Sequence, residues 1–231
     1  MYPLEVPAKN TAQEVRFLLR ALKLKKGQGL LDLGCGVGRH SIPLARAGFR
    51  VTGFDLTQRY LAQAKRRAIG SSIRWVRGDM RRLPFQNEFD AAINMFTSFG
   101  YFSNIQDDLQ VLRAVHRALK PRGVFFLDTF NGEYNRLNFR DQIWEELGGG
   151  RFVLRSNAWK ERDGIFTDWI FIDLRRGVGR GRSFIRMYDK KRISGLLRKT
   201  GFRPLRFWGD FQGHSYAPQR KRLMVLARKV L

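Results

Sequence analysis

The stretch Leu30-Leu31-Asp32-Leu33-Gly34-Cys35-Gly36-Val37-Gly38 decides the fold of this 231-residue chain. An apolar run of strand length ends in three closely spaced glycines, and an amphipathic segment follows that ends before Gly48. Glycines between a strand and a helix leave bare backbone where a ligand can approach closely. The pattern therefore predicts a strand, a ligand-binding turn and a helix, as in nucleotide-type pockets.

The glycine spacing disfavours a hydride-transfer enzyme that binds a dinucleotide. The dinucleotide fingerprint requires a third glycine at the position that Arg39 occupies. Asp32 at the end of the strand would repel a pyrophosphate but would suit a ligand that carries an ammonium or sulfonium group. We therefore expect a cationic ligand near Asp32.

Apolar runs and amphipathic segments alternate along the first half of the chain. Strands are expected at 29–33, 50–56, 73–77, 89–95 and 124–128. Helices are expected after the first, second and fourth of these strands, and the last helix ends at 121–123. This alternation predicts an α/β fold with a doubly wound, mostly parallel sheet. A helix is expected before the first strand, beginning at a capping box formed by Thr11 and Glu14.

The alternation stops near residue 130. A helix is expected around 134–147, followed by three strand-like segments at 152–159, 165–174 and 183–188. Consecutive strands with short connections predict an antiparallel meander. We therefore expect a core of residues 1–147 and 189–231 with an inserted antiparallel β lid of residues 148–188. A helix capped by Asp189 and two strands, 202–208 and 222–229, complete the core.

Further acids close the next two strands. Asp55 ends the second strand, where a carboxylate can accept hydrogen bonds from both hydroxyls of a ribose. Asp79 and Met80 follow the third strand, where an adenine could be bonded and packed. Asn94 lies at the carboxyl end of the fourth strand. Ligands of parallel sheets bind along this edge, so these residues are expected to form one site.

These motifs, in this order, resemble the class I methyltransferases that use S-adenosylmethionine. The stretch 119–123 resembles the segment before the fifth strand of that family. The resemblance implies a seven-stranded, Rossmann-like sheet whose last strand is antiparallel, in a branch that acts mostly on small acceptors. The cofactor contacts that we expect are Asp32, Gly34, Cys35, Gly36, Gly38, Asp55, Leu56, Asp79, Met80 and Asn94.

Composition narrows the class of protein. The chain has one cysteine, which excludes an intramolecular disulfide and a multi-cysteine zinc site. It lacks a signal-peptide pattern and a run of eighteen apolar residues, so we expect a soluble, cytoplasmic protein without a metal. The formal net charge is +24, and residues 151–231 hold 21 basic but only 6 acidic residues. Either an anionic partner or solubility explains such a surplus.

Two classes of acceptor fit the sequence. A small molecule is favoured by aromatic residues that could roof a pocket, namely Phe96, Phe99, Tyr101, Phe102, Trp159, Trp169 and Phe171. RNA is favoured by an arginine-rich segment predicted to be a flexible turn, with Arg175, Arg176, Arg180, Arg182 and Arg186 among Gly177, Gly179 and Gly181. The fourth strand lacks the polar-Pro-Pro-aromatic signature of base amino-group methylation. A third interpretation is a cofactor-binding, RNA-associated protein without turnover.

Methyl transfer from a sulfonium is a direct displacement that needs positioning and exclusion of water. A general base is needed only for an acceptor that arrives protonated. The sequence predicts His214, in the loop between the last two strands, as that base, and Tyr101 as a second catalytic candidate. Asp128 and Tyr216 are the alternatives, and a solvent-exposed loop histidine is the competing interpretation of His214. His40 and His116 are expected to be packing or surface residues.

Overall fold

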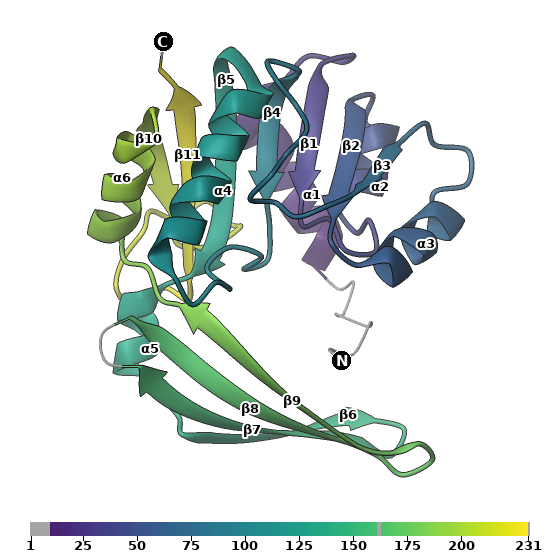
Figure 1. Ribbon diagram of the computed structural model, residues 1–231, viewed down its shortest axis with the longest axis vertical. Helices are drawn as coiled ribbons and strands as arrows, with labels where there is room; N and C mark the ends of the chain where they lie inside the picture. Colours follow the sequence, from purple (N-terminus) through teal and green to yellow (C-terminus); the bar gives the residue numbers. More distant parts are fainter. Residues whose placement is uncertain (1–9, 161–162, 231) are drawn as a thin grey trace.

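The strands predicted in the first half of the chain lie next to one another in a seven-stranded sheet. The computed structural model describes residues 10–160 and 163–230. The sheet has the order β10-β11-β5-β4-β1-β2-β3 (Figure 1). Its strands are β1 (Gly29–Leu33), β2 (Arg50–Asp55), β3 (Arg74–Arg77), β4 (Phe89–Asn94), β5 (Leu119–Phe130), β10 (Phe202–Trp208) and β11 (Arg222–Lys229). The first five pair in parallel, and β11 is antiparallel to both neighbours. The predicted sheet is confirmed.

Helices cover both faces of this sheet because alternate residues of each buried strand point to opposite sides. In β5, Phe125 packs with α4 (Ile105–Ala118) and α6 (Lys190–Lys199), whereas Phe126 packs with α1 (Thr11–Leu22) and α2 (Ser41–Arg46). The helix α3 (Gln58–Arg67) lies beside the glycine-rich turn after β1, where a Cβ on Gly38 would lie 3.4 Å from the Cβ of Ala64. All five residues of β1 are buried, so the strand that leads to the glycines is rigidly packed.

Two local predictions at helix ends are wrong. Thr11 is the first residue of α1 rather than its N-cap, and Asn10 precedes the helix without a side-chain cap. The carboxylate of Glu14 binds Arg39 and His40 instead of the helix terminus. Tertiary ion pairing has therefore replaced the predicted capping box. Residues 119–123, predicted as the end of a helix, belong to β5, and Leu119 pairs with Phe89.

A separate antiparallel sheet, the accessory sheet, follows α5 (Gly132–Leu137). Its strands are β6 (Gln142–Gly148), β7 (Arg151–Lys160), β8 (Gly164–Asp173) and β9 (Gly177–Arg186). The predicted helix is wrong beyond Leu137, because residues 142–148 pair with β7. The ring of Trp144 stacks on that of Phe152, with 5.5 Å between the ring centroids. The apolar spacing of this stretch also suits a helix, and cross-strand pairing decides between the two.

The predicted arginine-rich turn is likewise mostly strand. Residues 177–186 form β9, whose glycines 177, 179 and 181 pair with residues 173, 171 and 169 of β8. Arg186 at the end of β9 is only 2% exposed, so it is unavailable to a polyanion. The other four arginines of the segment are exposed.

The accessory sheet is attached to the main sheet at one end. Figure 1 shows it extending from the region of α5, on the side of the main sheet at which β1 and β2 end. That side carries the predicted cofactor residues. Within the described parts of the chain, no helix is long and apolar enough to cross a membrane.

Candidate active site

The glycine-rich turn after β1 is held open by left-handed backbone. Gly34, Gly36 and Gly38 have φ angles of +72°, +54° and +78°, which residues with a side chain rarely adopt. The amides of Gly34 and Cys35 both donate to the carbonyl of Phe54, which fastens the turn to β2. A Cβ on Gly34 would lie 2.8 Å from the Ser98 Cβ, but one on Gly36 would meet no described atom within 4 Å. The backbone at Gly36 is therefore accessible to a ligand.

Asp55 is fixed beside this turn. One carboxylate oxygen accepts from the amide of Gly36 and the other from the amide of Thr57, each at 2.8 Å. A carboxylate oxygen can accept more than one hydrogen bond, so both retain capacity for a diol. Leu56 follows with a 64% exposed side chain at the rim. The arrangement suits a polar sugar next to an apolar contact.

Asp32 lies deeper than the turn. It is 1% exposed, and its carboxylate accepts a 2.5 Å hydrogen bond from the Ser41 hydroxyl. Burial raises the pKa of Asp32. Ser41 thus holds Asp32 within the protein, and its direct contact with a cationic ligand stays a prediction.

Asp79 already has a strong partner. The guanidinium and the amide of Arg81 both donate to its carboxylate, and these hydrogen bonds lower the pKa of Asp79. Arg81 also lies over the ring of Phe102, with its Cζ 4.7 Å from the ring centroid. Met80 packs against the core cluster. An adenine contact by Asp79 would therefore share its carboxylate with Arg81.

The β4–α4 loop, residues 95–104, borders the turn with strained backbone. Phe96 and Thr97 have φ angles of 56° and 62° although neither is glycine. The carboxylate and the carbonyl of Asp128 accept from their two amides. Asp128 is fully buried, and its Oδ1 accepts from the Nε of Arg222 at 2.7 Å. Such strain persists only where the surroundings impose it, and it is common at functional sites.

The pair of Asp128 and Arg222 is a feature that the sequence did not predict. From the sequence, Asp128 is predicted only as an alternative base. In the structure, its carboxylate accepts from the backbone amide of Phe96 and pairs with Arg222. Arg222 also donates to the hydroxyl of Thr97. Because 94 residues separate the two partners, no local pattern could have identified them.

The residues around Gly36 fit the cofactor that the resemblance implies. Asn94 is fully buried and donates to the carbonyl of Leu33. Its Oδ1 atom is buried and lacks a hydrogen-bond partner among the described residues, so an acceptor is left unused beside the turn. The open backbone at Gly36, the carboxylate of Asp55 and this unused acceptor together suit a polar nucleoside.

Cys35 has no nucleophilic character in this setting. Its side chain is buried, and burial raises the pKa of the thiol, so it stays protonated at neutral pH. Cys35 is therefore a small, inert side chain in the turn, and its predicted contact with the cofactor stays a prediction. Within residues 10–160 and 163–230, no cluster of three or more metal-ligating side chains is present.

The two catalytic candidates lie on different loops. Tyr101 is in the β4–α4 loop and is 47% exposed. His214 lies between β10 and β11, with a side chain that is 56% exposed and an Nδ1 atom 2.9 Å from the Oδ2 atom of Asp210. Arg220 donates to the same carboxylate. The hydrogen bonds found for the His214 side chain among described residues thus connect it to Asp210 rather than to the predicted cofactor contacts.

Asn131 and Tyr216 fix the loop that carries His214. The amide of Asn131 donates to the carbonyls of Ala217 and Arg220. The hydroxyl of Tyr216 donates to Glu133 and lies 3.0 Å from the Oδ1 atom of Asn131, and burial together with Glu133 raises the pKa of Tyr216. Tyr216 is therefore a poor candidate for a base.

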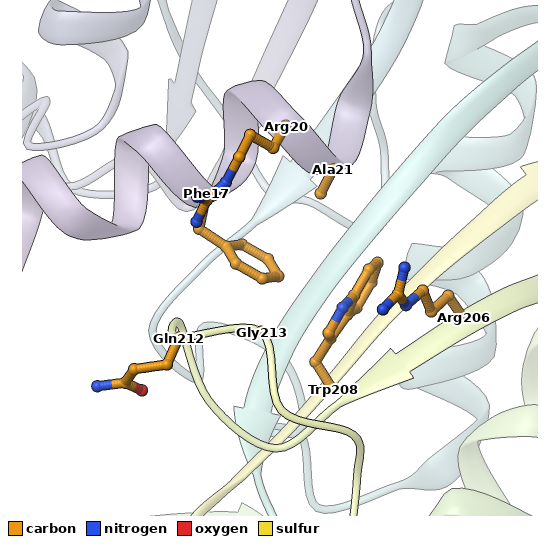
Figure 2. Close-up of a pocket in the computed structure, with 7 residues that line it drawn as sticks. All are labelled: Phe17, Arg20, Ala21, Arg206, Trp208, Gln212 and Gly213. Carbon is orange, nitrogen blue, oxygen red and sulfur yellow. The ribbon is translucent and has the colours of Figure 1, made fainter.

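A surface hollow is lined in part by the same loop (Figure 2). Its lining residues are Phe17, Arg20, Ala21, Arg206, Trp208, Gln212 and Gly213. They come from α1, from the end of β10 and from the following loop. The hollow shares no lining residue with the predicted cofactor contacts.

Comparisons with known proteins agree with this geometry. Residues 30–123 match the family described as "Methyltransferase domain". The putative methyltransferase YqeM of Bacillus subtilis is 28% identical over 216 residues, covering 89% of this chain and 85% of that protein. The glycine/sarcosine N-methyltransferase of Aphanothece halophytica is 26% identical over 216 residues, covering 87% and 76%.

A solved structure extends the likeness to the whole fold. An S-adenosylmethionine-dependent methyltransferase from Clostridium acetobutylicum superposes with a TM-score of 0.84 at 20% identity. The superposition covers 98% of this chain and 94% of that one, so both the main and the accessory sheet are included. The fold and the family resemblance predicted from the motifs are confirmed.

Proposed function

The chain is a class I S-adenosylmethionine-dependent methyltransferase, and on that premise we propose that it methylates an oxygen, nitrogen or carbon nucleophile of a small-molecule acceptor. The observation that carries the proposal is the β4–α4 loop. It carries the exposed side chains of Phe96 and Tyr101. The Phe96 ring centroid lies 4.8 Å from the Cζ of Arg39, which follows the glycine-rich turn, and buried Asp128 fixes the backbone of Phe96. A preformed wall of aromatic side chains with fixed polar groups, here Arg39 and Arg222 beside the Phe96 ring, suits a small ligand.

When bound, S-adenosylmethionine supplies an electrophilic methyl group on a sulfonium. In this proposal, the amide backbone at Gly36 and the carboxylate of Asp55 bind and orient the nucleoside. The β4–α4 loop excludes water and orients the acceptor, which raises the rate by positioning. The accessory sheet, for which the sequence predicts a lid of residues 148–188, would close the site.

An acceptor that must lose a proton needs a base, and His214 is the proposed group. Asp210 orients the imidazole by accepting from Nδ1–H, which leaves Nε2 to take a proton. Burial alone would raise the pKa of Asp210, but its bonds to His214 and the charge of Arg220 lower it overall. Asp210 therefore stays charged and able to stabilise an imidazolium. Tyr101 is the second candidate, as a group that binds the acceptor's polar atom.

An RNA acceptor is the second candidate function. Four exposed arginines of the accessory sheet favour it, namely Arg175, Arg176, Arg180 and Arg182. The name of the Aphanothece relative instead gives small acceptors, glycine and sarcosine. That relative covers most of this chain, which supports the small-molecule proposal over RNA.

Transfer of a labelled methyl group to cell extract tests the proposal. The extract is separated afterwards into RNA, protein and small molecules, and label is expected in the small-molecule fraction. The Asp55→Ala variant is the control for transfer that depends on the cofactor site. Label in RNA that is lost when the four exposed arginines are neutralised would favour the alternative. Absence of label from all fractions would contradict methyl transfer to any cellular acceptor.

A further inference from the structure

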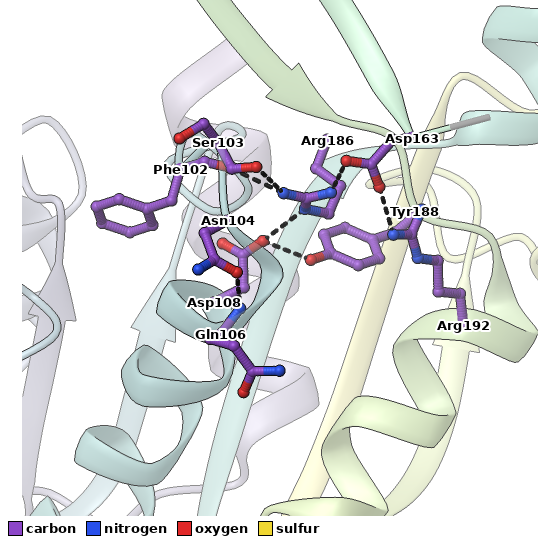
Figure 3. A network of polar contacts seen from close by, with 9 residues as sticks. All are labelled: Phe102, Ser103, Asn104, Gln106, Asp108, Asp163, Arg186, Tyr188 and Arg192. Atoms are coloured by element: carbon purple, nitrogen blue, oxygen red, sulfur yellow. Dashed lines mark hydrogen bonds and ion pairs between the residues drawn. The ribbon is translucent and has the colours of Figure 1, made fainter. Parts of the chain in front are cut away.

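Arg186 ends β9 at the junction between the accessory sheet and the main sheet (Figure 3). Its side chain is 2% exposed. Nε donates to Asp108 of α4 at 2.9 Å, and Nη1 donates to Asp163 in the turn between β7 and β8. Nη2 donates to the carbonyls of Phe102 and Ser103, each at 3.0 Å. All three guanidinium nitrogens are therefore used, on three different segments.

The surrounding groups hold Arg186 in one position. Asp108 is fully buried and also accepts from the Tyr188 hydroxyl at 2.7 Å. Arg192 of α6 donates to the other oxygen of Asp163 at 2.5 Å. Two carboxylates thus bind two guanidinium groups and one phenol. A buried arginine whose every nitrogen is bonded has little freedom to shift.

The backbone of Arg186 contacts the same loop. Its amide donates to the carbonyl of Gly100 at 2.7 Å. Gly100 has a φ angle of +93°, and a Cβ there would lie 3.1 Å from the carbonyl oxygen of Arg186. Arg186 therefore binds the residues immediately before and after Tyr101, while the Tyr101 side chain stays 47% exposed.

We propose that Arg186 is a positioning residue that sets the place of Tyr101 at the acceptor site. It binds the backbone on both sides of Tyr101 and, through Asp163, ties that backbone to the accessory sheet. This inference rests on the proposed function, in which Tyr101 contacts the acceptor. Any shift of the attached end of the accessory sheet is thereby transmitted to Tyr101.

The chemistry of the cluster supports a positioning role over simple packing. A buried ion pair such as that of Arg186 with Asp108 often gives no more stability than apolar residues of the same size would give. A guanidinium, however, presents donors in fixed directions and can hold several carbonyl oxygens at once. Lysine carries the same charge without that fork, so an Arg186→Lys variant separates charge from geometry.

The first test follows Tyr101 directly by ¹⁹F NMR of protein labelled with fluorotyrosine. Loss of one signal in Tyr101→Phe assigns the resonance. In Arg186→Lys, we expect the Tyr101 signal to shift and broaden while that of Tyr60 on α3 does not change. Arg155→Lys is the matched control, because Arg155 also binds a carboxylate in the accessory sheet, that of Glu145, without bonding to the loop. An unchanged Tyr101 signal in Arg186→Lys would overturn the proposal.

The second test uses methyl transfer to the small-molecule fraction. Arg186→Lys should lower turnover about tenfold while calorimetry shows unchanged affinity for S-adenosylhomocysteine, since one or two hydrogen bonds to the loop are lost. In a Tyr101→Phe background, the same substitution should cost less than twofold. Independent, multiplying effects of the two substitutions would overturn the proposal.

Two further points keep the tests decisive. If Arg186→Lys does not fold, Asp163→Asn removes the outer carboxylate but keeps the bonds from Arg186 to Asp108 and to the loop carbonyls. A smaller shift of the Tyr101 signal is then expected, and no shift would contradict the proposal. The NMR test needs no acceptor, so absence of turnover in the wild-type protein would refute the proposed function and leave the positioning of Tyr101 to be judged separately.

Discussion

The Nη1 atom of Arg39 lies 2.6 Å from the Oε2 atom of Glu14, and this ion pair joins α1 to the residue after the glycine-rich turn. The same oxygen lies 2.7 Å from the Nε2 atom of His40. Glu14 is only 3% exposed and the Arg39 side chain only 15%, so removing the charge of Glu14 leaves a largely buried guanidinium without its carboxylate. The first helix thus contributes directly to the order of the cofactor turn.

Glu14→Gln should lower the free energy of unfolding by about 3 kcal/mol, the usual loss when one partner of a buried pair is removed. Denaturant titration followed by circular dichroism measures it. Glu88→Gln is the control, because the pair of Glu88 with Arg74 is exposed and should contribute less than about 1 kcal/mol. Equal losses in the two variants would show that burial of Glu14 contributes nothing.

Asp55→Ala should weaken binding of S-adenosylmethionine and of S-adenosylhomocysteine by about tenfold or more. The expected loss is one charge-assisted hydrogen bond to the ribose, about 1.5 to 3 kcal/mol. The substitution also removes the acceptor of the Gly36 amide, which loosens the turn. Isothermal titration calorimetry measures both ligands, with Asp168→Ala on the accessory sheet as the control. Unchanged affinity in Asp55→Ala would refute the ribose assignment.

The parts of the fold that could be predicted are those set by local pattern. The run from Leu30 to Gly38 specifies strand and turn through residues that are neighbours in sequence, and the structure keeps that order. The acids at the strand ends were found for the same reason. Parallel pairing then brings Asp55 and Asn94 to one edge without further information.

The parts that could not be predicted depend on partners far apart in the chain. The spacing of Thr11 and Glu14 is that of a capping box, and only the position of Arg39 in space reveals the ion pair. The apolar residues of β6 fit a helix equally well until β7 pairs with them. Arg186 was assigned to an exposed basic segment because no local feature indicates that Asp108, 78 residues away, buries it.

Stability should fall as the pH is lowered from 7 to 5. Burial, together with the charge of Lys229, lowers the pKa of His116 below its ordinary value of 6.5. The unfolded chain therefore takes up a proton just below pH 6.5 while the folded protein does not, which favours unfolding. The stability that neutral His116 contributes is fully present above pH 6.5. It is lost as the pH falls from 6.5 toward the lowered pKa of His116 in the folded protein.

Denaturant titrations at pH 7 and pH 5 measure this effect. His116→Gln removes the titrating group, so the difference between the two pH values should shrink relative to that of the wild-type protein. His214→Gln is the matched control, because the His214 side chain is 56% exposed. If the pH dependence of stability is unaltered in His116→Gln, groups other than His116 cause it.

His214→Ala should lower turnover by about a hundredfold or more with cofactor affinity preserved, the usual size of a positioned proton transfer. The structural basis is the Asp210 carboxylate, which binds Nδ1 and so presents Nε2 as the basic atom. Asp210→Asn keeps the imidazole but removes the charge that stabilises its protonated form, so it should cost less than His214→Ala and shift the acidic limb of the pH profile to lower pH.

Rates measured from pH 5 to 9 on the methyl-accepting small-molecule fraction distinguish His214 from the other candidates. Loss of the acidic limb in His214→Ala, with Tyr101→Phe retaining it, would identify the histidine as the base. Turnover and pH profile that both survive in His214→Ala would exclude it. The base would then be sought at Tyr101, because Asp128 is bound to Arg222 and the pKa of Tyr216 is raised, or the acceptor would need no base.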